Sequence, residues 1–187
     1  VVEGYMDVIA LHEKGIKNAV ATMGTAVTSN HLSKLLRYSN NIFFAFDGDL
    51  AGGKAAWKAL QNVLPIIRED TRIKFVFFEA GDDPDSYVNK HGEKSFIELI
   101  NNGQPLSEYF FSKVKAVDDL NSLEGRSKIA SYASKLISTI NNISLREAFI
   151  SETSKICEIP IEKLISKPSQ SKPKAAAEGV KSNQANN

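Results

Sequence analysis

The sequence contains very little cysteine, and this scarcity limits what the chain can be. Cys157 is the only cysteine among 187 residues, so no disulfide can form within the chain. No stretch approaches the roughly 18 apolar residues that a membrane-spanning helix needs, and no basic-then-apolar signal segment opens the sequence. We therefore expect a protein of the reducing cytoplasm without membrane association, in which Cys157 is a small core residue.

Net charge of either sign is the second thing that the sequence lacks. There are 23 Lys and Arg residues against 22 Asp and Glu residues, which gives a formal net charge of +1. A domain that holds nucleic acid by charge alone is usually clearly basic. Any contact with nucleic acid must therefore be local, or be shared with other parts of a longer protein.

Several common binding motifs are also absent from the sequence. His12, His31 and His91 are isolated from one another, and neither they nor Cys157 have the spacing of a zinc site. No glycine-rich segment matches the P-loop or the dinucleotide-binding fingerprint. Zinc binding and these two modes of nucleotide binding are therefore not predicted.

Short apolar runs alternate with helical patterns in the first half of the chain. The runs predicted as strands are 1–2, 19–21, 42–46 and 73–78, and the helical patterns between them are 5–14, 29–36 and 51–67. Strands that are apolar on both faces and alternate with helices are typical of a parallel sheet covered on both sides. The pattern predicts an α/β fold of that kind.

The character of the sequence changes after Pro84. Apolar residues then recur only at helical spacing as far as Ile165, which indicates a small helical bundle. From Lys167 the chain is rich in Ser, Lys, Pro, Ala, Asn and Gln without apolar periodicity, a composition that predicts a disordered linker. The predicted organisation is a sheet domain at 1–103, a helical subdomain at 104–166 and a linker at 167–187.

Acidic residues follow three of the four predicted strands. In a parallel sheet the carboxyl ends of the strands meet at one edge, where ligands bind. Clustered carboxylates tolerate one another mainly when cations neutralise them, and hard oxygen ligands suit Mg²⁺ or Mn²⁺ better than zinc. We therefore predict a divalent-metal site built from Glu3, Asp7, Asp47, Asp49, Asp83 and Asp85.

Each motif also has a purely structural interpretation. Asp47-Gly48-Asp49 alone is an ordinary turn sequence, and Asp83 could simply cap a helix that begins at Pro84. Gly24, Thr25 and Gly52 place small residues and backbone N–H groups near the same edge, which suits phosphate but also suits tight turns. The joint placement of acids at three strand ends favours the metal site.

Four segments give a more specific indication. Glu3-Gly4-Tyr5-Met6-Asp7 resembles the EGYMD motif that opens the TOPRIM domain of bacterial DnaG-type DNA primases. Residues 24–28 resemble that family's GTALT segment, and residues 46–57 resemble its FDGDxAGxxAAW stretch. Asp83-Pro84-Asp85 is similar to its DPD motif. The order and spacing hold over residues 1–89, and the predicted helices of 105–165 resemble the helical subdomain that closes the polymerase region of these primases.

The resemblance implies a nucleotidyltransferase of DNA replication. Such a primase is a DNA-directed RNA polymerase of the primosome that makes short RNA primers on single-stranded DNA from nucleoside triphosphates. By resemblance, Glu3, Asp7, Asp47 and Asp49 would be catalytic. The further implied roles are metal ligation by these four with Asp83 and Asp85, and cofactor or phosphate contact by Gly24, Thr25 and Gly52.

The same resemblance implies which parts of a primase the chain lacks. Zinc is expected only in an N-terminal module outside this chain, and Mg²⁺ or Mn²⁺ is expected within it. The replicative helicase is expected to bind through a C-terminal domain that is also outside. The fragment alone is therefore expected to be weakly active or inactive.

Two alternatives remain open from the sequence. Another TOPRIM enzyme, a topoisomerase or a nuclease, would use the same acids, although a topoisomerase also needs a nucleophilic tyrosine. The five tyrosines all lie in helical patterns that predict packing roles, and the EGYMD form favours a primase. The other alternative is a non-catalytic module that uses the acids for a structural cation.

Overall fold

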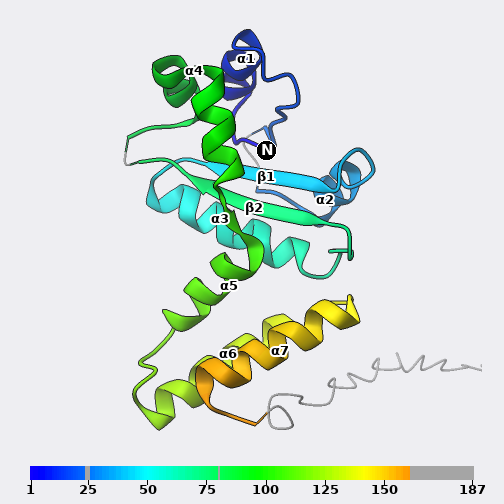
Figure 1. The fold of residues 1–187 in the computed structure, drawn as a ribbon, viewed down its shortest axis with the longest axis vertical. Coiled ribbons are helices and arrows are strands. Elements are labelled where there is room, and N and C mark those ends of the chain that lie inside the picture. The colour runs from blue at the N-terminus through cyan, green and yellow to red at the C-terminus, as the bar shows by residue number, and fades with distance from the viewer. Residues whose placement is uncertain (24–25, 80, 161–187) are drawn as a thin grey trace, which may run out of the picture.

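The computed structural model describes residues 1–23, 26–79 and 81–160. Within these ranges helices and strands alternate first and helices follow (Figure 1). The elements are α1 (Tyr5–Glu13), α2 (Ser29–Leu35), β1 (Asn41–Phe46), α3 (Leu50–Val63), β2 (Arg72–Phe77), α4 (Pro84–Asn101), β3 (Gln104–Pro105), α5 (Leu106–Lys115), α6 (Leu123–Ile137) and α7 (Ile143–Cys157).

The two long strands of the sheet run parallel, as the sequence predicts. β1 and β2 pair in parallel from their first to their last residues. The N-terminal segment lies beside β1, because the Ala45 N–H donates to the Val1 carbonyl at 2.9 Å. Val2 in turn forms a parallel bridge with Ala21. The predicted α/β fold with a parallel sheet is confirmed, with its first two strands reduced to one isolated bridge between them.

One edge of the sheet differs from the expectation of helices alone after Pro84. β3 pairs antiparallel with β2 through Gln104 and Pro105. A two-residue strand is too short to show a period-two pattern, and a proline, which has no N–H to donate, is compatible with an edge strand. The sequence therefore carried no readable signal for β3.

Helices cover both faces of the sheet. On one face Phe44 and Phe75 pack in a core with α2, α3 and α5. On the other face Ala45 and Val76 pack in a second, smaller core with α1 and α4. Alternate residues of β1 and β2 thus supply both cores, as expected for a strand with side chains on alternating sides.

The helical part of the chain continues the larger core. Phe110 of α5 lies 6.3 Å from Trp57 of α3 and 5.0 Å from Phe149 of α7, measured between ring centroids. The apolar core is thus continuous across the predicted boundary between residues 103 and 104. The predicted domain limits therefore stay a proposal. The predicted linker, 167–187, lies outside the described residues.

Two local predictions are confirmed, the cap at Asp83 and the burial of Cys157. Thr28 caps α2 and Asp83 caps α4, which begins at Pro84. Gly15 follows α1 with a φ of 96°, in the left-handed region that favours glycine. Cys157 is buried. No helix among the described residues is long and apolar enough to cross a membrane.

The packing role predicted for the tyrosines is wrong for two of them. Tyr5 is 58% exposed and Tyr38 is 90% exposed. Both lie in helical patterns, but each occupies the solvent side of its segment. Helical spacing locates an apolar face only when several apolar residues share it.

Candidate metal site at the carboxyl edge of the sheet

Gly48 allows the ends of β1 and β2 to approach each other closely. A Cβ atom at Gly48 would lie 2.1 Å from the Phe78 carbonyl oxygen and 2.5 Å from that of Glu79. No side chain fits in that space. The glycine between Asp47 and Asp49 therefore holds both acids against the end of β2, a role that the turn pattern alone did not reveal.

Asp49 and Gly52 build the first turn of α3. The Gly52 N–H donates to Asp49 Oδ1 at 2.7 Å, so Asp49 caps the helix. A Cβ atom at Gly52 would lie 2.2 Å from the Asp47 carbonyl oxygen. Gly52 thus has a packing reason to be glycine, and its predicted contact with phosphate stays a prediction.

Glu3 and Asp7 approach the same edge from the N-terminal segment and α1. Glu3 Oε1 is buried and has no hydrogen-bond partner. Asp7 is buried, and its Oδ2 accepts a hydrogen bond from the Gly4 N–H at 3.0 Å. A buried carboxylate oxygen without a donor is unfavourable unless a cation or a ligand completes it.

Asp83 and Asp85 come from the start of α4. Asp83 Oδ1 accepts from the Ser86 N–H at 2.7 Å, and Asp85 Oδ1 accepts from Asn89 Nδ2 at 2.6 Å. Each carboxylate therefore has a structural role as well as its place at the edge. The cap at Asp83 is the structural interpretation that the sequence left open, and it does not remove the second oxygen from use.

Asp82 behaves differently from its neighbours. Its carboxylate is paired with Lys90, and the hydrogen bond from Lys90 holds the pKa of Asp82 below its usual range. Asp82 is thus neutralised by a cation from α4, the helix that follows it, whereas Glu3, Asp7 and Asp47 are repelled by neighbouring acids.

Burial, together with repulsion from neighbouring acids, raises the pKa values of three acids at this edge, Glu3, Asp7 and Asp47. Burial, followed by repulsion from Glu3, Asp7, Asp83 and Asp49, raises the pKa of Asp47 to about 6. Burial is also the largest cause for the raised pKa of Glu3 and of Asp7. Together these interactions join one group, called the acid cluster below: Glu3, Asp7, Asp47, Asp49, Asp83 and Asp85.

The acid cluster suits an open site for a hard divalent cation that keeps bound water, rather than a site in which protein ligands surround the metal. Within the described ranges, no three His, Cys, Asp or Glu side chains already converge as a metal site would require. Mg²⁺ usually keeps several waters and binds through one or two carboxylates together with substrate phosphates. The oxygen-only donor set and the orphaned Glu3 Oε1 agree with an open site of that kind.

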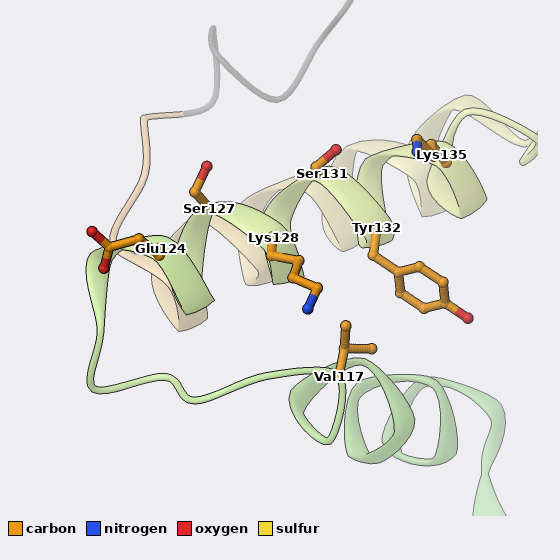
Figure 2. Close-up of a pocket in the computed structure, with 7 residues that line it drawn as sticks. All are labelled: Val117, Glu124, Ser127, Lys128, Ser131, Tyr132 and Lys135. Carbon is orange, nitrogen blue, oxygen red and sulfur yellow. The ribbon is translucent and has the colours of Figure 1, made fainter.

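The remaining predicted site residues and the surface grooves lie outside the acid cluster. Gly24 and Thr25 lie outside the described residues, so their contact with phosphate stays a prediction. Two grooves, of about 490 and 710 Å³, lie in the helical part. In the first, Lys128 of α6 points toward Val117, and Tyr132 extends from the same helix beside it (Figure 2). No member of the acid cluster lines either groove.

Two family models match the chain. A model described as Toprim-like matches residues 1–88, which hold the parallel strands and the acid cluster. A model described as DnaB-helicase binding domain of primase matches residues 107–162. That second match falls on α5–α7, whereas the sequence analysis placed the helicase contact in a C-terminal domain outside the chain.

Curated and solved relatives agree with these matches. The DNA primase of Pseudomonas aeruginosa is 48% identical over 147 residues, which is 78% of this chain and 22% of that protein. A crystal structure of a DNA primase domain from Pseudomonas aeruginosa superposes with a TM-score of 0.84 at 44% identity, over 87% of this chain and 51% of that one. A DnaG primase catalytic domain bound to ssDNA gives a TM-score of 0.78 at 38% identity, over 82% of this chain and 50% of that one.

The fold and the acid cluster together define a TOPRIM domain with an appended helical part. The chain belongs to the bacterial DnaG-type DNA primases, as their TOPRIM catalytic core and following helical subdomain. It spans about a fifth of the length of the curated relative above and half of the solved primase domains.

Proposed function

We propose that this chain is the metal-binding catalytic part of a primase that synthesises short RNA primers on single-stranded DNA. The observation that carries the proposal is the acid cluster, in which six carboxylates from three strand ends and α1 are coupled to one another. Membership of the primase family supports the reaction class, which is nucleotidyl transfer from nucleoside triphosphates.

Glu3, Asp47 and Asp49 are proposed as the principal ligands of Mg²⁺ or Mn²⁺, with Asp7 as a further catalytic acid. When bound, the cation neutralises charge on the transferred phosphate and favours ionisation of the attacking hydroxyl. The protein's part is to hold the carboxylates in place. Gly48 fixes the Asp47–Asp49 turn against β2, and the cap at α3 orients Asp49.

The supporting residues are proposed to act at the edge of this site. Asp83 and Asp85 would hold a further cation or its bound water, because both repel Asp7 and Asp83 also repels Asp47. Gly24 and Thr25 would contact phosphate through their backbone N–H groups. Gly52, whose N–H is donated to Asp49 Oδ1, would contact phosphate through its backbone without donating that N–H. All of these assignments are tested by substitution.

The whole primase is proposed to act in the cytoplasm with a DNA template, nucleoside triphosphates, an RNA primer and the replicative helicase. A relative solved with ssDNA supports the template, and the name of the second family model supports the helicase. Zinc is proposed only for an N-terminal module of the longer protein. One solved relative is described as containing zinc binding and RNA polymerase domains.

A Mn²⁺ titration followed by electron paramagnetic resonance tests the site. Wild type should bind Mn²⁺ and bind it more tightly with a nucleoside triphosphate present, and the Asp47→Asn, Asp49→Asn double variant should lose both effects. A matched control is Asp118→Asn with Asp119→Asn, two adjacent acids in the helical part. Equal Mn²⁺ binding by wild type and the site variant would show that the ligands are misassigned.

A primer-synthesis assay tests the reaction itself. The chain alone should give weak or no template-directed synthesis, and a polypeptide that also holds the other half of the catalytic core should be active. The Asp47→Asn, Asp49→Asn substitution in that longer polypeptide should abolish synthesis. Tight Mn²⁺ binding without nucleotide, together with full activity of the double variant, would indicate a structural cation instead.

A further inference from the structure

Tyr109 of α5 lies where the helical part meets the sheet. Its ring centroid is 4.7 Å from that of Phe75 and 5.2 Å from that of Phe77, both on β2. Trp57 of α3 packs edge-on against it at 6.3 Å. These three ring contacts would also hold a phenylalanine at this position, so the hydroxyl group needs a separate explanation.

The Tyr109 hydroxyl donates a hydrogen bond to the Gly53 carbonyl oxygen at 3.2 Å. Burial raises the pKa of Tyr109 to about 12, so the group is a protonated donor throughout the physiological range. The two residues are 56 positions apart in the sequence. The bond therefore ties α5 to the first turn of α3.

That first turn carries Asp49. The Gly53 N–H donates to the Asp49 carbonyl oxygen at 3.1 Å, and the Gly52 N–H donates to Asp49 Oδ1 at 2.7 Å. Two consecutive glycines make a weak start for a helix, because glycine loses the most backbone freedom on ordering. Gly52 is required by the Asp47 carbonyl, whereas a Cβ atom at Gly53 would meet nothing within 4 Å.

We propose that Tyr109 is a positioning residue, whose hydroxyl holds the glycine turn of α3 and thereby orders the Asp47–Asp49 loop. The helical part then completes the geometry of the acid cluster, although none of its residues belongs to the cluster. The consequence for metal binding rests on the proposed function. The ordering of the turn stands on the contacts alone.

Amide hydrogen exchange by NMR tests the ordering without metal. Tyr109→Phe keeps the ring and removes the hydroxyl, so the Gly52 and Gly53 amide protons should exchange about threefold to tenfold faster, the range set by one lost hydrogen bond. The Phe44 amide in β1 should be unaffected. Tyr132→Phe on α6 is the matched control and should change neither glycine. Unchanged glycine exchange, or an equal rise at Phe44, overturns the proposal.

A rescue variant separates positioning from general destabilisation. Gly53→Ala stiffens the same turn by a different route, and in the Tyr109→Phe background it should restore slow exchange at Gly52. A failure of Gly53→Ala to restore it would show that the hydroxyl does not act through the turn.

Mn²⁺ affinity is the functional measurement, made on wild type, Tyr109→Phe, Tyr132→Phe and the Tyr109→Phe, Gly53→Ala double variant. Tyr109→Phe should weaken Mn²⁺ binding about threefold to tenfold, and added Gly53→Ala should restore it. Normal affinity with fast glycine exchange overturns the link from the turn to the site. Absence of Mn²⁺ binding by wild type contradicts the proposed function, while the exchange data still decide whether Tyr109 orders the turn.

Discussion

The acid cluster and the aromatic junction both adjoin the sheet but are built on opposite principles. The aromatic junction consists of Trp57, Phe75, Phe77, Tyr109 and Phe110. Its rings lie 4.7 to 6.3 Å apart and bury apolar surface, which is favourable. At the ends of the strands the acid cluster instead brings like charges together. Burial, followed by this repulsion, raises the pKa of Asp47 to about 6.

The difference shows where this chain gains stability and where it gives stability up. The junction stabilises the fold with or without a bound cation, because apolar burial requires no partner from solution. The cluster destabilises the metal-free fold at neutral pH, because ionised carboxylates repel one another. The apolar packing of the core compensates for this loss of stability. A bound cation turns the contribution of the acid cluster to the free energy of unfolding from unfavourable to favourable.

The largest effect is expected in the aromatic core. Phe110 is fully buried against Phe111 and Phe149, so Phe110→Ala should lower the free energy of unfolding by about 3–5 kcal/mol. Urea unfolding measures it. Tyr38→Ala, at a residue that is 90% exposed, is the control and should stay within about 0.5 kcal/mol. A loss below about 1 kcal/mol for Phe110→Ala would break the comparison.

A smaller but more specific effect is expected at Gly48. Gly48→Ala forces a methyl group toward the Phe78 carbonyl oxygen, so unfolding should become easier by about 1–3 kcal/mol and Mn²⁺ binding should fall. Gly53→Ala is the matched control, because its methyl group meets nothing within 4 Å. It should be neutral or stabilise by up to about 1 kcal/mol. Wild-type Mn²⁺ affinity in Gly48→Ala would show that the turn does not shape the site.

A substitution inside the acid cluster is expected to stabilise the metal-free protein, whereas Phe110→Ala and Gly48→Ala are expected to destabilise it. The pKa of Asp47 is about 6 when folded and about 3.9 when unfolded, so the folded state binds more protons between these values. Stability therefore falls as pH rises from about 4 to 6. Asp47→Asn removes this loss and should stabilise the metal-free protein at pH 7 by about 1–2 kcal/mol after solvent screening of a half-exposed group.

Urea midpoints from pH 4 to pH 8 check the Asp47 prediction. The advantage of Asp47→Asn should be small at pH 4, where the folded state is protonated and the unfolded state is about half protonated, and should grow up to pH 7. Asp82 supplies a contrast, because Lys90 holds its pKa below the usual range. Asp82→Asn should therefore not stabilise the protein at pH 7. A stabilisation of equal size in both variants would mean that the cluster is not special.

The smallest effect is expected in binding to single-stranded DNA. The chain has a formal net charge of +1 and carries the acid cluster, so few DNA phosphates can be neutralised. Fluorescence anisotropy should show weak binding, with a slope of log affinity against log salt smaller than about 2 in magnitude. Tight binding with a steep slope would reveal a basic surface that the charge distribution does not suggest.

The sequence predicted the cluster because strand ends and acidic turns are local patterns. Asp47 and Asp83 were found from the residues beside them, and the parallel order of the strands brought them to one edge. β3 was missed because two residues carry no pattern. The roles of Gly48 and Tyr109 depend on contacts with Phe78 and Gly53, which are distant in sequence and leave no local signal.

The stability of wild type and Asp47→Asn, measured at pH 7 with and without Mn²⁺, tests the central claim most directly. Without metal the variant should be the more stable protein, because one repelling charge is gone. With saturating Mn²⁺ the order should reverse, because only wild type gains the binding free energy of an intact site. A variant that is less stable without metal, or a wild type that gains nothing from Mn²⁺, would contradict the account.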